Sequence, residues 1–222
     1  MERKEIKEIW EKFKIDIIYN NRYFSGTQIM WILNKLKHNG DKKEEKICKY
    51  YRSRIGSYAR YDDHTMYAPP SKLTVSGRCN PVGIPYLYLS NSKETAINET
   101  KPSVGDTITV ATFEVDVSNI FSFIDNESYM NNESLDEDVK ILMEFISEDL
   151  RKVIPKDDKL SYIPLQFIAE YIKNLGYDGF VYLSTVGDGE NLVMFNGKEK
   201  SKIIKKEEVV ITEIKICSEA KE

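Results

Sequence analysis

The sequence predicts an α+β fold in which short strands form a sheet and helices flank it. Apolar residues recur at helical spacing in several separated segments, and alternating stretches typical of strands lie between them. This mixture of short strands and separated helices favours α+β over a doubly wound parallel sheet. No internal repeat is evident.

Composition limits the class of protein. The 222 residues, 41% hydrophobic and 31% charged, suit one main globular domain with an appendage. The three cysteines (Cys48, Cys79 and Cys217) are few and far apart, which favours a reducing compartment over a disulfide framework or zinc site. With His38 and His64 as the only histidines, a multi-His metal site is excluded. The sequence shows no signal peptide and no membrane span, so we expect a cytoplasmic protein.

Two amphipathic helices are predicted near the N-terminus, over residues 1–19 and about 27–36. The first has its apolar residues three and four apart, at Ile6, Ile9, Trp10, Phe13 and Ile17. The charged run 41–46 is the best domain boundary. We therefore expect a helical N-terminal extension (1–45), a main domain (46–216) and a short tail (217–222).

The central part of the chain begins with an alternating stretch, 47–56, that predicts a strand. Because side-chain direction has a period of two, Arg52 and Arg54 share one face of it. A long tyrosine-rich loop follows at 57–76. The Gly/Pro/Asn-rich segment 77–85, which carries Arg78, then runs into an apolar strand, and 92–99 is predicted to be a short helix.

The distal half of the chain contains further predicted helices and strands. One strand, or two short ones, is predicted over 107–117, and a loop over 119–135. One helix starts at the capping box 134–137 and ends before Pro155, and a second runs from Pro164 and is stopped by Gly176. Paired strands follow at 179–184 and 191–195, with a last strand at 209–216.

Several kinds of site are absent from the sequence. It contains no GxGxxG, no Walker-type phosphate loop and no GxSxG. The net charge of −4 and the lack of a basic, aromatic-rich face disfavour a nucleic-acid partner. The positive charge is concentrated in the first 100 residues, where it favours an anionic ligand; residues 101–222 carry 14 Lys/Arg against 24 Asp/Glu.

The remaining residue types, Arg, Tyr, Glu and Ser, suit cleavage of an N-glycosidic bond to a ribose that carries a pyrophosphate. Guanidiniums hold phosphates, and a carboxylate stabilises an oxocarbenium-like transition state. The nicotinamide of NAD⁺ is a cationic leaving group and needs no general acid, so the lack of a well-placed histidine is no obstacle.

Three central segments and several distal ones follow one another in a specific order. They are Tyr51-Arg52-Ser53-Arg54, Gly77 to Ser90, Glu94 to Glu99, Tyr162 to Glu170, Gly176 to Phe180, Tyr182-Leu183-Ser184 and Asn191 to Phe195. In order and combination they resemble the RES domain, a family named for its Arg, Glu and Ser, and the resemblance covers roughly 47–216.

The resemblance implies a fold like that of ADP-ribosyltransferases, with a split mixed sheet and flanking helices. It also implies a toxin of a toxin–antitoxin pair that consumes NAD⁺ as an NAD⁺ phosphorylase, a glycohydrolase or a protein ADP-ribosyltransferase. The acceptor (inorganic phosphate, water or a protein side chain) is left open. The implied partner is an antitoxin with a helix-turn-helix domain. No metal or membrane is implied, and a homo-oligomer is left open.

By position, Arg52 best matches the family arginine, with Arg78 second. Arg52, Arg78 and an assisting Arg54 are expected to bind the pyrophosphate. Tyr88 is expected to stack on or position the nicotinamide riboside, Glu99 to stabilise the sugar cation, and Ser184 to contact the nicotinamide side or an acceptor phosphate.

Each of these residues also has a structural interpretation. The arginines can be strand-edge charges or bonds to loop carbonyls, Tyr88 a core tyrosine, and Ser184 a turn cap. A module that binds ADP-ribose or NAD⁺ without cleaving it, with residues 1–45 as a partner-docking arm, is the main alternative function.

Overall fold

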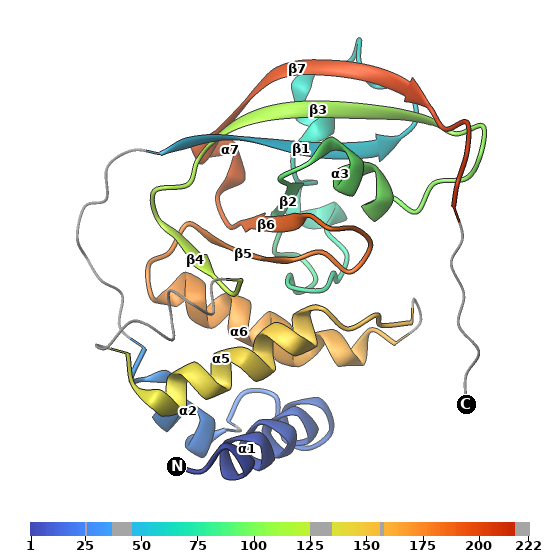
Figure 1. Cartoon of the computed structure of the whole chain (residues 1–222). Coiled ribbons are helices and arrows are strands. Elements are labelled where there is room, and N and C mark those ends of the chain that lie inside the picture. Colours follow the sequence, from blue (N-terminus) through green and yellow to red (C-terminus); the bar gives the residue numbers. More distant parts are fainter. Residues whose placement is uncertain (25, 37–45, 125–134, 156–157, 216–222) are drawn as a thin grey trace.

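A seven-stranded mixed sheet forms the centre of the computed structural model, and helices pack beneath one half of it (Figure 1). The structure describes residues 1–24, 26–36, 46–124, 135–155 and 158–215. In the order β4-β5-β6-β2-β1-β3-β7, the strands are β4 (Ile120–Ser122), β5 (Gly179–Leu183), β6 (Glu190–Met194), β2 (Leu87–Ser90), β1 (Ile47–Ile55), β3 (Thr107–Asp116) and β7 (Ser201–Val210). The α-helices are α1 (Arg3–Ile15), α2 (Thr27–Leu33), α3 (Lys93–Glu99), α5 (Glu137–Leu150), α6 (Ile163–Asn174) and the short α7 (Gly197–Lys200).

The sheet is divided between β1 and β2. These two strands share a single antiparallel register pair, Tyr51 with Ser90, whereas β1 pairs with β3 along its whole length. Among the described strands, β4 and β5 alone run parallel to each other. The fold is therefore α+β with a split mixed sheet, as predicted.

Local sequence signals set several helix ends. The Ser92 side chain accepts a hydrogen bond from the backbone N–H of Thr95 at 3.0 Å and so caps α3. Helix α5 is capped by Asp136; the predicted capping residue Ser134 lies outside the described residues. After α6, Gly176 adopts φ 95°, a left-handed conformation that suits glycine and ends the helix.

The N-terminal helices belong to the larger of two hydrophobic clusters. The first helix buries Ile6, Trp10 and Phe13, in the same cluster as Phe180 of β5 and Val193 of β6. In Figure 1, α1 and α2 lie beyond α5 and α6, on the side away from the sheet. The helical extension therefore contributes directly to the core under the sheet.

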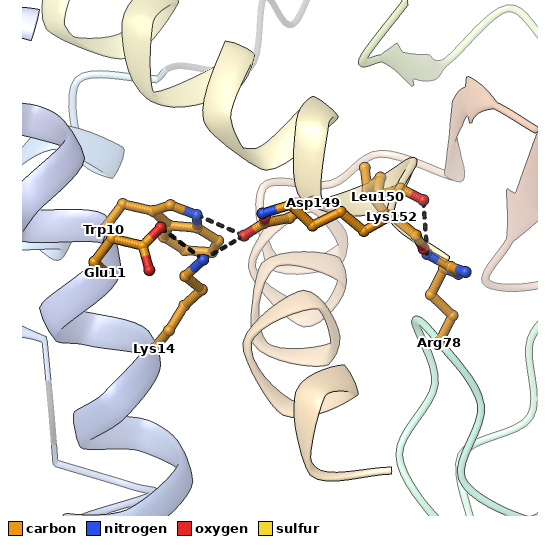
Figure 2. Close-up of polar contacts among 7 residues, drawn as sticks. All are labelled: Trp10, Glu11, Lys14, Arg78, Asp149, Leu150 and Lys152. Atoms are coloured by element: carbon orange, nitrogen blue, oxygen red, sulfur yellow. Dashed lines mark hydrogen bonds and ion pairs between the residues drawn. The ribbon is translucent and has the colours of Figure 1, made fainter. Parts of the chain in front are cut away.

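A buried carboxylate links α1 to α5. Asp149 accepts hydrogen bonds from Trp10 Nε1 and Lys14 Nζ, both at 2.8 Å, and from Lys152 (Figure 2). Burial alone would raise the pKa of Asp149, but the hydrogen bonds from Lys14, Lys152 and Trp10, together with the Lys14 charge, hold the pKa below its usual value. Asp149 is thus a charged contact between the extension and the rest of the fold.

Two sequence predictions about strands were wrong. The last strand occupies Ser201–Val210 and not 209–216, and Ile120–Ser122 forms a short strand where a loop was expected. The last strand is at an edge of the sheet and largely exposed. Charged residues therefore occupy many of its positions, and the sequence shows no clear alternation of apolar and polar residues there. The predicted boundary at 41–46 falls almost wholly outside the described residues. No helix in the described ranges is long and apolar enough to cross a membrane.

Candidate active site

A pocket of about 270 Å³ opens where the sheet splits. Residues from β1, β2, α3, β5 and β6 line it, so elements from both halves of the sheet contribute. The lining residues are Tyr51, Arg52, Ser53, Tyr88, Leu89, Ser90, Ala96, Glu99, Thr100, Tyr182 and Asn191. Three predicted site residues, Arg52, Tyr88 and Glu99, are therefore together at one pocket.

Glu99 is the last residue of α3 and carries the carboxylate of this pocket. Its Oε1 accepts a hydrogen bond from Ser184 Oγ at 2.8 Å and another from Asn191 Nδ2 at 2.5 Å. None of the described residues donates to Oε2. The side chain is exposed to solvent, so one carboxylate oxygen is fixed by the protein and the other is available to a ligand.

Ser184 directly follows β5 and is buried. Its N–H donates to the Gly189 carbonyl at 2.8 Å, which closes the turn between β5 and β6. Its Oγ also accepts from the N–H of Val186 at 3.2 Å while it donates to Glu99. The structure thus brings Ser184 to Glu99, although 85 residues separate them.

Arg52 bridges the split in the sheet. Its Nη1 donates to the Tyr88 carbonyl at 2.9 Å. The Arg52 side chain thus provides a hydrogen bond to a backbone carbonyl of β2 at the point where β1 and β2 separate. Its Nε is buried and has no partner among the described residues. Although the residue as a whole is only half-buried, burial and the nearby Arg54 lower the pKa of Arg52 to about 10. The guanidinium therefore remains positively charged at neutral pH.

The other two predicted arginines do not line the pocket. Arg54 Nη2 lies 3.4 Å from the Tyr67 carbonyl. Arg78 Nη1 donates to the carbonyls of Leu150 and Lys152, at 2.8 and 2.9 Å (Figure 2). Carbonyls at the end of a helix lack partners within the helix and attract a cation. Arg78 is therefore bound to the end of α5 and is not among the residues that line the pocket.

Tyr88 contributes its ring to the pocket wall, while its hydroxyl is held by the preceding loop. That hydroxyl donates to Asn80 Oδ1 at 2.9 Å and accepts from the N–H of Cys79 at 3.1 Å. Burial, with the nearby Cys79, raises the pKa of Tyr88 well above its usual value. The phenol therefore stays neutral and fixes the loop against β2.

Sequence reasoning missed several lining residues as site residues. Ser90, Asn191 and Tyr182 occupy adjacent strands: Ser90 pairs with Asn191, and Asn191 with Tyr182. Asn191 is 5% exposed. A polar residue at the head of the apolar segment 191–195 is a signal that could have been used, because buried amides need partners. Ser53 Oγ, also at the pocket, is buried and has no hydrogen-bond partner among the described residues.

No group of three or more His, Cys, Asp or Glu side chains among the described residues is arranged to hold a metal ion. The site consists of a guanidinium, a carboxylate, hydroxyls, an amide and aromatic rings.

Comparison with known proteins gives a match to a protein family and matches among solved structures. No curated protein matches the chain in sequence. Among solved structures, the crystal structure of the M. tuberculosis MbcT–MbcA toxin–antitoxin complex matches with 14% identity and a TM-score of 0.46, over 75% of this chain and 86% of that one. The RES domain family matches residues 49–212, most of the chain and all the residues that line the pocket. The chain therefore belongs to the RES domain family.

Proposed function

We propose that this protein cleaves the bond between nicotinamide and ribose in NAD⁺ and acts as a toxin. The observation that carries the proposal is the Glu99 carboxylate, held through one oxygen by Ser184 and Asn191, in a pocket that also contains Arg52. The proposal also draws on the chain's membership of the RES domain family.

The pocket size favours one end of the dinucleotide as its occupant. Ligand pockets typically span about 300–1,000 Å³, and this one is about 270 Å³. Such a volume suits the nicotinamide and its ribose better than a whole dinucleotide. The pyrophosphate would then lie at the mouth, within reach of the positively charged Arg52 guanidinium, which lines the pocket and suits an anion.

In the proposed reaction, Glu99 acts through its free oxygen. As the C–N bond breaks, the bonding electron pair leaves with nicotinamide, which becomes neutral, and positive charge develops on the ribose. A fixed carboxylate stabilises that charge more in the transition state than in the ground state. The ring of Tyr88 forms a wall beside the nicotinamide riboside, and Ser184 orients the carboxylate. An acceptor oxygen from water, phosphate or a protein side chain then bonds to the ribose carbon.

The test is nicotinamide release from NAD⁺ by the purified protein, measured by liquid chromatography, alone, with phosphate and with cell extract. Free ADP-ribose identifies water as acceptor, a phosphorylated ADP-ribose identifies phosphate, and labelled protein identifies a transferase. Glu99→Gln, which keeps the shape and removes the charge, should lower the rate about 10²–10³-fold. Glu94→Gln, the same change at the start of the same helix, should leave it unchanged. NAD⁺ binding without turnover would instead support the non-catalytic module.

The proposed biological partner, an antitoxin with a helix-turn-helix domain, is tested by the neighbouring gene. Expression of the chain alone should arrest growth and deplete cellular NAD⁺, and co-expression with the neighbour should prevent both. Growth arrest by the Glu99→Gln variant at the same protein level would show that toxicity does not depend on this site.

A further inference from the structure

Asn191 makes a hydrogen bond at each end of its amide, and both bonds lead to the pocket. Its Oδ1 accepts from Ser90 Oγ at 2.8 Å, and its Nδ2 donates to Glu99 Oε1 at 2.5 Å. The side chain is 5% exposed. An asparagine held this way has one rotational state, because an amide has a donor end and an acceptor end.

The sheet register sets this arrangement. Asn191 of β6 is directly paired with Ser90 on β2 and with Tyr182 on β5. Side chains directly opposite on neighbouring strands lie on one face and in contact range. The three strands β2, β5 and β6 therefore fix the position of the Asn191 amide. Glu99, in contrast, is the last residue of a helix of only seven residues.

The Glu99 carboxylate, which can only accept, determines which end of the Asn191 amide faces it, and the Ser90 hydroxyl holds the other end. With the Ser90 hydroxyl donating to Oδ1, the NH₂ group is directed to the carboxylate. The flipped amide would place Oδ1 against Glu99 Oε1, and two acceptor oxygens repel each other. The Ser90–Asn191–Glu99 chain thus has one favourable orientation.

The carboxylate receives both of its protein hydrogen bonds on the same oxygen. Ser184 and Asn191 approach Oε1 from β5 and β6, respectively. A carboxylate held by one donor can swing about that bond, whereas two donors at one oxygen restrict the swing. The rotation of the carboxyl group, and with it the position of Oε2, is therefore set by the pair of donors.

We propose that Asn191, held by Ser90, is a positioning residue that fixes the Glu99 carboxylate with Oε2 directed to the ribose of the substrate. This inference rests on the proposed function. It adds a second fixed donor beside Ser184 and explains why a polar residue occupies a buried position at the start of β6. Asn191 acts through Glu99 and does not itself carry out chemistry.

The main test is Asn191→Asp, which keeps the shape and replaces the NH₂ donor by a second carboxylate. At pH 7, kcat should fall about 10–100-fold, with the KM for NAD⁺ nearly unchanged. Two close carboxylates share a proton, so the acid limb of the pH–rate profile should move to higher pH by about one unit or more. The other titratable side chains around the pocket, Arg52, Tyr51, Tyr88 and Tyr182, are unaltered.

A purely structural role would lower activity equally at every pH, so an unshifted acid limb in folded Asn191→Asp overturns the inference. Ser90→Ala provides a second test and decides the question if Asn191→Asp does not fold. It should lower kcat about fivefold, the value of one neutral hydrogen bond, and an unchanged kcat overturns the inference. Asn119→Asp makes the same chemical change just before β4, away from the pocket, and should retain the wild-type profile.

The outcomes separate the two proposals. If wild-type protein releases no nicotinamide, or if Glu99→Gln is as active as wild type, the proposed function fails and the inference falls with it. If Glu99→Gln is inactive while Asn191→Asp and Ser90→Ala behave as wild type, only the positioning role is wrong. In a Glu99→Gln background, Asn191→Ala should cost no further activity; an additional loss would contradict action through Glu99.

Discussion

Replacing Asp149 by alanine should lower the free energy of unfolding, because it removes a buried contact between α1 and α5. Asp149 is 8% exposed, and it accepts hydrogen bonds from Trp10 and Lys14 on α1 and from Lys152 at the end of α5. Removing the carboxylate leaves the buried indole N–H of Trp10 without its acceptor and leaves the half-buried Lys14 ammonium paired with Glu11 alone among the described residues. The change therefore removes the attraction between Asp149 and Lys14 and also leaves a buried donor without a hydrogen bond, which is itself destabilising.

The magnitude follows from this environment. Breaking a buried, hydrogen-bonded charge pair by removing one partner costs roughly 3–5 kcal/mol. For a protein of this size, about 2–4 °C of melting temperature corresponds to each kcal/mol, so the midpoint should fall by roughly 6–20 °C. The loss also depends on pH. Because the folded pKa of Asp149 is depressed, its stabilisation is present above the unfolded pKa of about 3.9 and is lost as pH falls through the folded pKa.

The assay is urea unfolding of wild type and variant at several pH values between 3 and 7. A matched control is Glu144→Ala. Glu144 is on the same helix, α5, and its carboxylate pairs with Arg3 of α1 at the surface. Since Arg3 is 53% exposed, the control should cost less than about 1 kcal/mol. If Asp149→Ala costs no more than Glu144→Ala, or if its cost does not shrink below about pH 4, then Asp149 is not the buried link that the geometry indicates.

Two further predictions separate the arginines by what each one contacts. Arg52→Lys removes the planar guanidinium and its bond to Tyr88, so NAD⁺ should bind about 10–100-fold more weakly by calorimetry; unchanged affinity would remove Arg52 from the proposed ligand site. Arg78→Ala breaks two bonds to carbonyls at the end of α5 and should cost roughly 1.5–3 kcal/mol in urea unfolding, while nicotinamide release per folded molecule stays at the wild-type level. A loss of turnover as large as that of Arg52→Lys would instead place Arg78 at the substrate.

Most of the elements could be predicted from local patterns, because the information for them is local. The spacing of Ile6, Trp10 and Phe13 predicts α1, and Gly176 predicts the end of α6. The last strand was misplaced because an edge strand is half-exposed and carries charged residues on its open side. Its position is decided by pairing with β3, a contact between distant segments.

The same distinction applies to the site. The sequence by itself determined the residue types and, through the order of the RES segments, the choice of Arg52, Glu99 and Ser184 as site residues. It did not reveal that Arg78 would bind the end of α5, since that carbonyl acceptor comes from a helix 72 residues away. Nor did it assign a role to Asn191, whose partners depend on strand register.

Only the tertiary structure decided which of these groups meet. The contact of Glu99 with Ser184 and Asn191, and the position of Arg52 at the break in the sheet, arise from how β1 and β2 separate while β2, β6 and β5 stay in register. Hydrogen bonds act over about 3 Å, whereas sequence separation says little about distance once the chain folds back. The chemistry is therefore encoded in the residue types, and its geometry in the long-range pairing of the strands.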